Sequence, residues 1–272
     1  MPMKSKRDVD PGLVRVLRFM IWMFIWEVIS RIVGDSIPFA GPIETLVVLA
    51  EKMLHKEFYI AVWTTFSGIA AGFLAAMIVG TFLGYQAYFH KNVDFMITPV
   101  IDFFRYIPMI TFTLLAIFWS HSSALAFEVS IFLALPVIYK HTLTGLKNSN
   151  QHYLKRVRQI KMQPLKKIIY IYQPVAMPEY IPGCHRALNM CWKSGIIAQL
   201  LGNTRHSIGS MLFTARDEAD VAGIFAWTIV IVGLSVLFEQ IVIRLLSLDK
   251  YNAGRVDLSA VFEELEDEEI SL

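Results

Sequence analysis

The sequence is short of charge, of cysteine and, over one long stretch, of acidic residues. Only 18% of its 272 residues are charged and 55% are hydrophobic, whereas a soluble domain is nearer a quarter charged. This balance excludes an ordinary soluble domain. Two cysteines, Cys184 and Cys191, are too few for a disulfide framework or a cysteine-based metal site. We therefore expect an all-α polytopic membrane protein without a metal site.

Nucleotide-binding and catalytic motifs are missing as well. The sequence has no GxxxxGK[ST] loop, so the chain cannot hold ATP in the usual phosphate-binding loop. It has no HExxH or GxSxG motif, and its apolar runs contain no paired carboxylates. These absences argue against an intramembrane enzyme and predict no cofactor in this chain.

Long apolar runs are present instead, and a helix needs about 20 residues to cross a bilayer. Six runs predict six transmembrane helices at residues 14–33, 58–89, 95–119, 124–139, 181–201 and 221–246. We read the first run as a retained span, because no small-residue cleavage site follows it. The expected organisation is an N-terminal tail (1–13), a membrane domain (14–248) with a loop at about 140–178, and an acidic tail (249–272).

Lysine and arginine near the ends of the runs predict the orientation. Basic residues precede the first run and follow the second, fourth and sixth runs, whereas the other connections are mixed in sign. Cytoplasmic loops carry the excess of Lys and Arg. Both termini and the 140–178 loop are therefore expected in the cytoplasm. The acidic tail from Asp257 onward is expected to be a solvated extension, with a regulatory contact to the basic loop as an alternative.

The loop itself contains no acidic residue between Glu128 and Glu179. Its eight bases are Lys140, Lys147, Lys155, Arg156, Arg158, Lys161, Lys166 and Lys167. It is also amphipathic, since apolar residues recur at roughly helical spacing at Leu154, Val157, Ile160, Leu165, Ile168 and Tyr172. Pro164 interrupts this pattern and Pro174 is expected to end it. The pattern favours a cytoplasmic docking element, and the alternative is an anchor on anionic lipid, to which each base could contribute about 1 kcal/mol.

Small residues form a stripe along the second run. They recur at every fourth position, at Gly68, Gly72, Ala76, Gly80 and Gly84. Without side chains in the way, a second helix can approach such a stripe closely. A contact within one subunit is favoured over a dimer interface, and the alternative is that glycine is simply common in membrane helices.

Charged residues inside the runs are candidates for function, because a charge in a bilayer usually lines a cavity or has a partner. Lys193, with Trp192 beside it and Gln199 beyond, predicts a polar lining that attracts an anion. The alternatives for Lys193 are an ion pair with Glu27 or Glu128, or an interfacial position. Arg105 is a further path candidate, although an interfacial pair with Asp102 at the cytoplasmic start of the third run is favoured for it.

Four stretches carry a family resemblance: Trp26-Glu27, residues 105–108 (RYIP) with the run to Trp119, the loop ending at 171–174 (IYQP), and residues 192–209 (WKSGIIAQLLGNTRHSIG). Over about residues 14–248 the chain resembles the inner-membrane permease subunit of a type I ABC importer. The similar branch includes nitrate, sulfonate, taurine and thiamine-precursor permeases. The chain departs from the family pattern at Lys155-Arg156-Val157, at Lys161 in place of glycine, at Ser120 and at Gln199. Pro164 is expected to begin the second short helix of the loop.

The resemblance implies a transport subunit that acts in pairs, with a homodimer favoured. It implies an ABC ATPase dimer that binds ATP and Mg, and an external solute-binding protein. A coupling helix at about 155–163 would dock on the ATPase. The implied coupling residues are Lys155, Arg156, Val157, Ile160, Lys161, Met162, Gln163 and Pro164. The implied solute is a small oxyanion such as a sulfonate or nitrate, or a thiamine precursor. The alternative function is an ATP-independent secondary transporter or channel, which would predict inverted repeats that we do not find.

Overall fold

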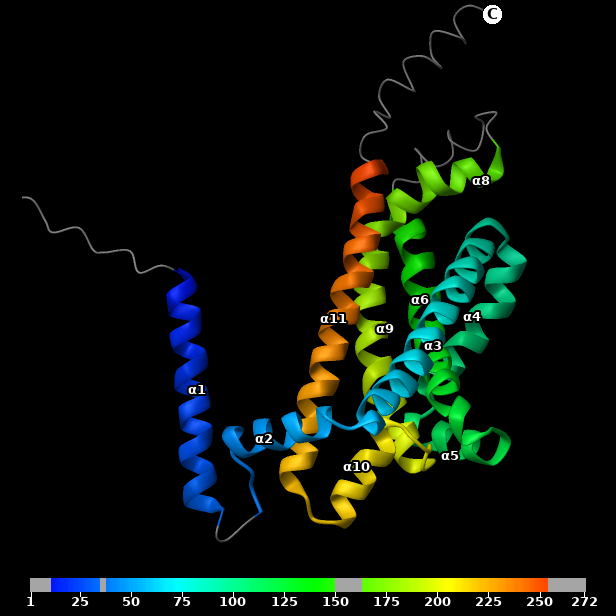
Figure 1. The fold of residues 1–272 in the computed structure, drawn as a ribbon. Coiled ribbons are helices and arrows are strands. Elements are labelled where there is room, and N and C mark those ends of the chain that lie inside the picture. Colours follow the sequence, from blue (N-terminus) through cyan, green and yellow to red (C-terminus); the bar gives the residue numbers. More distant parts are fainter. Residues whose placement is uncertain (1–10, 35–37, 150–162, 254–272) are drawn as a thin grey trace, which may run out of the picture.

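The computed structural model describes residues 11–34, 38–149 and 163–253, and over these residues the secondary structure is helical throughout (Figure 1). Short helices lie at the two ends of a bundle of long ones. The helices are α1 (Pro11–Val33), α2 (Pro42–Met53), α3 (Lys56–Phe89), α4 (Lys91–Tyr106), α5 (Met109–Trp119), the 3₁₀ turn η1 (Ser122–Ala124), α6 (Leu125–Asn148), α8 (Pro164–Lys167), the π-helical turn η2 (Ile168–Tyr172), α9 (Gln173–Leu201), α10 (Ile208–Asp217) and α11 (Val221–Ala253).

The centre of the bundle is formed by α3, α6 and α9, with α6 packed against both of the others. Glycines on α3 permit this approach. A Cβ atom added to Gly72 would lie 2.5 Å from the carbonyl oxygen of Phe127, and one added to Gly84 would lie 2.7 Å from Cβ of Thr142. The helix that lies along the small-residue stripe is therefore α6 of the same subunit.

The contact between α6 and α9 also depends on glycine. A Cβ atom on Gly145 would lie 2.8 Å from the carbonyl oxygen of Ala176, and one on Gly183 would lie 2.5 Å from Cβ of His141. The apolar core continues to α11, where Phe238 makes edge-on contacts with Phe66 and Phe73. The three central helices are thus closely packed, and the polar side chains on their outer faces have fixed positions relative to one another.

Three of the described helices are long and apolar enough to cross a membrane: α3, α6 together with η1, and α11 up to Ser247. The pair α4 and α5 makes a fourth if it is counted as one broken span. Helices α1 and α9 have 23 and 29 residues but carry several charges, among them Arg15, Arg18, Glu27 and Arg31 in α1. In its described part, the structure therefore contains three or four helices with the length and hydropathy of membrane spans.

The prediction of one continuous helix across residues 95–119 is wrong. Helix α4 ends at Tyr106, α5 begins at Met109, and the two axes differ in direction by 99°. The break falls at Ile107 and Pro108, which both have extended backbone angles. Proline disfavours helical geometry in the residue before it and cannot continue the hydrogen-bond ladder.

The start of α9 differs from the sequence prediction in one respect. Pro164 is the first residue of α8, which confirms that a helix begins there, while the first of the two expected short helices lies outside the described residues. Pro174 does not end the helix: α8, η2 and α9 follow one another without a break, and Pro174 is the second residue of α9, directly after the π-helical turn. Between the two prolines, Tyr172 is buried against Phe89, with ring centroids 4.9 Å apart. The helical segment after the basic loop is thereby anchored to the end of α3.

Helix α1 stands apart from the central bundle (Figure 1). It is joined to the rest through α2 and the start of α11: the indole nitrogen of Trp26 donates a 3.1 Å hydrogen bond to the carbonyl of Ala40, and its ring lies 5.5 Å from that of Phe225. Most of its apolar side chains, including Phe19 and Trp22, are exposed. Packing within this subunit therefore covers little of α1.

Candidate functional site

One face of helix α9 is exposed along its length. Apart from His185, which contacts Glu239 of α11, its exposed positions are spaced by three or four residues, and they include Pro178, Pro182, Arg186, Met190, Lys193 and Ile197. Since residues seven apart lie on the same face of a helix, Arg186 and Lys193 point the same way. Sequence reasoning singled out Lys193 but missed Arg186, although the seven-residue spacing was available as a signal.

A cavity of about 320 Å³ lies between α4, α6 and α9 beside this face. Four of its lining residues are basic or histidine: Arg105 from α4, Lys140 and His141 from α6, and Arg186 from α9. Arg186 is near the middle of α9 and is exposed. The structure thus brings Arg105 together with three residues that the sequence analysis did not select for the site.

Asp102 holds two of these cations. Its carboxylate lies 3.5 Å from Nη1 of Arg105 and 2.9 Å from Nζ of Lys140. The local pair between Arg105 and Asp102 was predicted, whereas the shorter contact with Lys140 was not. The prediction that Arg105 and Asp102 lie at the start of the third apolar run is wrong, because α4 begins at Lys91 and Arg105 lies in its last turn.

The remaining two groups differ in their surroundings. Nδ1 of His141 lies 3.7 Å from Oε2 of Glu179, and Gly183 lets the imidazole rest directly against the backbone of α9. Within the described residues, Arg186 forms no ion pair. One of the cations of the cavity is therefore without a carboxylate partner in the part of the chain that the structure describes.

A second cavity, of about 480 Å³, lies between α4, α5 and α6 and is mostly apolar. Glu128 is its one carboxylate-bearing lining residue and accepts a hydrogen bond from the hydroxyl of Ser120. Neither Glu128 nor Glu27 pairs with Lys193; Glu27 instead contacts Arg31 on α1 at 2.8 Å. Of the alternatives for Lys193, the ion pairs with Glu27 and Glu128 are absent from the described structure.

The two other path candidates lie inside the subunit and not on the exposed face of α9. Trp192 is buried between α3 and α11, with its ring 6.3 Å from Phe66 and 6.5 Å from Phe238. Gln199 is fully buried, and its Oε1 accepts a 2.7 Å hydrogen bond from the hydroxyl of Thr65. That hydroxyl also accepts a 2.9 Å hydrogen bond from the backbone nitrogen of Ile208. Through these contacts, Trp192 and Gln199 of α9 pack against α3 and α11, and the hydroxyl of Thr65 connects α3 to α10.

Replacing Thr65 with valine should destabilise the fold by about 2 kcal/mol, because it leaves two buried groups, Gln199 Oε1 and Ile208 N, without this partner. Thr113→Val is the matched control, since Thr113 is equally buried but its hydroxyl bonds only to the carbonyl of Met109, within its own helix. Thermal unfolding of the purified chain in detergent measures both. Equal shifts in the two variants would contradict the bridging role of Thr65.

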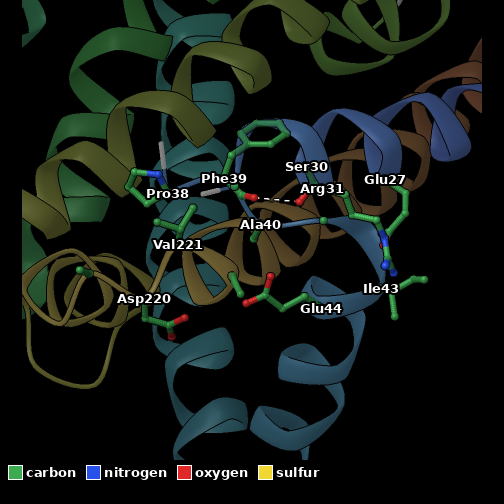
Figure 2. A pocket seen from close by; sticks show the side chains of 14 residues that line it. Glu27, Ser30, Arg31, Pro38, Phe39, Ala40, Ile43, Glu44, Asp220 and Val221 are labelled. Carbon is green, nitrogen blue, oxygen red and sulfur yellow. Dashed lines mark hydrogen bonds and ion pairs between the residues drawn. The ribbon is translucent and has the colours of Figure 1, made fainter. Parts of the chain in front are cut away.

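At the opposite end from α8, α1, α2 and the start of α11 enclose a cavity of about 580 Å³ (Figure 2). Its ionisable lining residues are Glu27, Arg31, Glu44 and Asp220. Asp220 lies 3.3 Å from Nζ of Lys52, and the hydroxyl of Ser30 donates to the carbonyl of Phe39 across the turn after α1. This cavity is acidic, in contrast to the basic one between α4, α6 and α9.

The expected coupling residues fall almost wholly in the part of the chain that the structure does not describe. Lys155, Arg156, Val157, Ile160, Lys161 and Met162 lie outside the described residues, and the chain resumes at Gln163 and Pro164. The coupling assignment therefore depends on the sequence pattern and on where α8 and η2 begin.

Comparison with known protein families identifies the family of the chain. The family described as the binding-protein-dependent transport system inner membrane component matches residues 68–247, which span α3 to α11. The chain belongs to this family. It is thus an inner-membrane, multi-pass permease component of a binding-protein-dependent ABC transport system for small solutes, which confirms the resemblance seen in the sequence. The permease is a non-catalytic subunit, and in this family ATP is bound by a partner ATPase.

Individual relatives are distant but cover most of the permease. It is 24% identical to the putative aliphatic sulfonates transport permease of Bacillus subtilis, over 80% of this chain and 79% of the relative. It is 21% identical to the bicarbonate transport system permease of Synechococcus elongatus, over 88% and 90% of the two chains. The nitrate import permease of the same organism is 25% identical, over 71% and 73%.

Proposed function

We propose that this permease forms the membrane path of an ATP-driven importer for a small anion. The observation that carries this proposal is the exposed face of α9, on which Arg186 and Lys193 lie two turns apart beside the basic cavity. Charges within a membrane domain commonly mark the path of a solute or ion. The path residues are Arg105, Lys140, Arg186 and Lys193, while the buried Trp192 and Gln199 support α9 from behind.

The class of solute is supported by charge and by the relatives together. Three of the relatives are named for small anions, namely aliphatic sulfonates, bicarbonate and nitrate, and a fourth is named for taurine, which carries a sulfonate group. A formylaminopyrimidine permease is also similar, at 21% identity, so a thiamine precursor is the second candidate. The cationic face favours the anion, because arginine and lysine bind a negatively charged group more strongly than the neutral acceptors of a pyrimidine.

Coupling to ATP hydrolysis is proposed to pass through residues 155–164. The acid-free, amphipathic pattern of this segment suits a helix that docks its apolar side in a groove of a separate ATPase. The anchoring of Tyr172 on Phe89 of α3 supports the transfer of motion, since a displacement of the loop would be passed to the central helices. Closure of the ATPase pair would then switch the permease between inward-open and outward-open states.

The same proposal includes six membrane spans, namely the four candidates given above together with α1 and α9, and both termini in the cytoplasm. The proposal includes the pairing of two identical permeases, and the apolar side chains of α1 that its own subunit leaves uncovered would face lipid or the second copy. An external solute-binding protein would deliver the anion to the face of the pair opposite the ATPase. This arrangement places the acidic cavity of Figure 2 on the external side.

Co-purification tests the proposal directly. A tagged permease, extracted from its own membrane in mild detergent, should retain an ATPase with a phosphate-binding loop, identified by mass spectrometry. Proteoliposomes of that complex, supplied with the binding protein, should take up solute only with ATP inside. A permease that retains no ATPase and transports without ATP would instead be a secondary transporter.

A further inference from the structure

The basic cavity between α4, α6 and α9 has more positive charge than its neighbouring carboxylates balance. Arg105, Lys140 and Arg186 line it. Asp102 contacts the first two, and Glu179 faces His141. Even when both carboxylates are counted against the three cations, one positive charge remains, and Arg186 is the cation without an ion pair among the described residues.

A charge without a partner inside a membrane domain is costly. An anion in the cavity would offset this cost. A guanidinium group presents a planar fork that binds two oxygens of a carboxylate, sulfonate or nitrate group at once. The cavity volume of about 320 Å³ is at the lower end of the range for ligand pockets, which suits a solute of a few heavy atoms.

Aromatic side chains separate this cavity from the apolar one. Phe104, Phe132 and Pro136 line both cavities and so form the wall between them. The ring of Phe132 is stacked on Phe112 of α5, with centroids 3.5 Å apart, and meets Phe104 of α4 edge-on at 5.3 Å. The wall therefore connects α6 to both α4 and α5, the two helices that meet at the 99° bend. On its far side lies Glu128, which would repel an anion.

We propose that this cavity is an anion-binding subsite of the membrane domain, in which Arg186 binds one small oxyanion with Lys140 and Arg105 beside it, and that the Phe104–Phe132 wall closes the subsite toward the apolar cavity. The subsite deepens the proposed transport function, on which it rests, by giving the solute a location and a charge. It also gives Asp102 a role, because holding Lys140 and Arg105 at its two sides keeps both cations at the cavity.

Charge-selective labelling tests the subsite without knowledge of the solute. Met190 lines the cavity and is exposed, so the Met190→Cys variant of the full chain places a thiol there. The reaction rates of an anionic and a cationic methanethiosulfonate reagent of similar size are compared in detergent. The unmodified chain gives the background, since Cys184 and Cys191 are buried. His55→Cys, at an exposed position between α2 and α3, gives the reference ratio.

The anionic-to-cationic rate ratio at Met190→Cys should exceed the reference about tenfold, because a cleft lined by one sign of charge concentrates counter-ions. Adding Arg186→Gln should remove most of this preference, whereas Arg186→Lys should retain it. Arg205→Gln, which removes an exposed charge from the turn between α9 and α10, should change nothing. Methanesulfonate, nitrate or bicarbonate should slow labelling in the Met190→Cys variant and not in the one that also carries Arg186→Gln.

A ratio equal to that at His55→Cys, or one unchanged by Arg186→Gln, would overturn the subsite. So would the failure of all three anions to slow labelling. These results are distinguishable from a failure of the transport proposal: ATP-driven uptake without charge-selective labelling removes the subsite alone, and charge-selective labelling in a chain that retains no ATPase removes the importer alone.

Discussion

The variant that carries both Val157→Asp and Ile160→Asp should lose ATP-driven uptake down to the background of empty liposomes, while the membrane domain remains folded. Val157 and Ile160 are three residues apart and therefore share one face of a helix. That face is proposed to be buried in the ATPase, and two carboxylates there would have to leave water without partners, at a cost of several kcal/mol. Uptake of solute by proteoliposomes measures the loss, and size-exclusion chromatography of the purified variant measures folding.

A control with the same change in charge isolates the apolar contact. Replacing Arg158 with glutamine and Gln159 with glutamate also lowers the net charge by two, on positions between Val157 and Ile160 in the sequence. This variant should keep most of its uptake if the apolar face is what docks. Equal loss in both variants would instead favour the lipid-anchor interpretation, in which only the charge matters, and normal uptake in the aspartate variant would rule out docking through this face.

Gly72→Leu should prevent α3 and α6 from packing and should destabilise the folded permease by about 3 kcal/mol or more. Even the first carbon of a side chain would lie 2.5 Å from the carbonyl oxygen of Phe127 and 2.7 Å from Cβ of Ser130. A backbone carbonyl cannot rotate away as a side chain can, so the helices themselves would have to separate. Gly72→Ala should fall between the wild type and Gly72→Leu in thermal midpoint and in yield of monodisperse protein.

Gly233→Leu is the matched control on α11. Gly233 is exposed, and a Cβ atom there would meet no heavy atom within 4 Å. The added leucine should therefore leave the thermal midpoint close to that of the wild type. If Gly72→Leu and Gly233→Leu behave alike, close approach at the stripe contributes little, and the spacing of four reflects only the frequency of glycine in membrane helices.

The all-helical class and several helix features could be predicted from the sequence because the signals for them are local. Runs of apolar residues, the small-residue stripe around Gly72 and the restart at Pro164 each depend on neighbouring residues and on backbone geometry. The family could be recognised for a related reason, since stretches such as residues 192–209 are contiguous. These features need no knowledge of which helix lies beside which.

The basic cavity could not be predicted because it is assembled from three helices. Lys140 was read as the first base of the cytoplasmic loop, whereas α6 continues to Asn148 and keeps Lys140 within the helix, 2.9 Å from Asp102. Arg186 lies in a segment that the hydrophobic pattern did separate as a span, yet only the packing of α4, α6 and α9 brings it to the same cavity as Arg105. Trp192 and Gln199 were selected for their polarity, and only the packing of α3 and α11 shows that they point inward.

The π-helical turn η2 has a consequence for comparing this permease with its relatives. Five residues, Ile168–Tyr172, occupy a turn of wider diameter between α8 and α9, and such turns hold about one residue more than an α-helical turn. The extra residue is absorbed within the turn, so losing one residue here would restore α-helical winding with little change in the direction of α8. A single-residue gap at this point of an alignment would therefore leave Lys166 and Lys167 facing nearly the same way as in this permease.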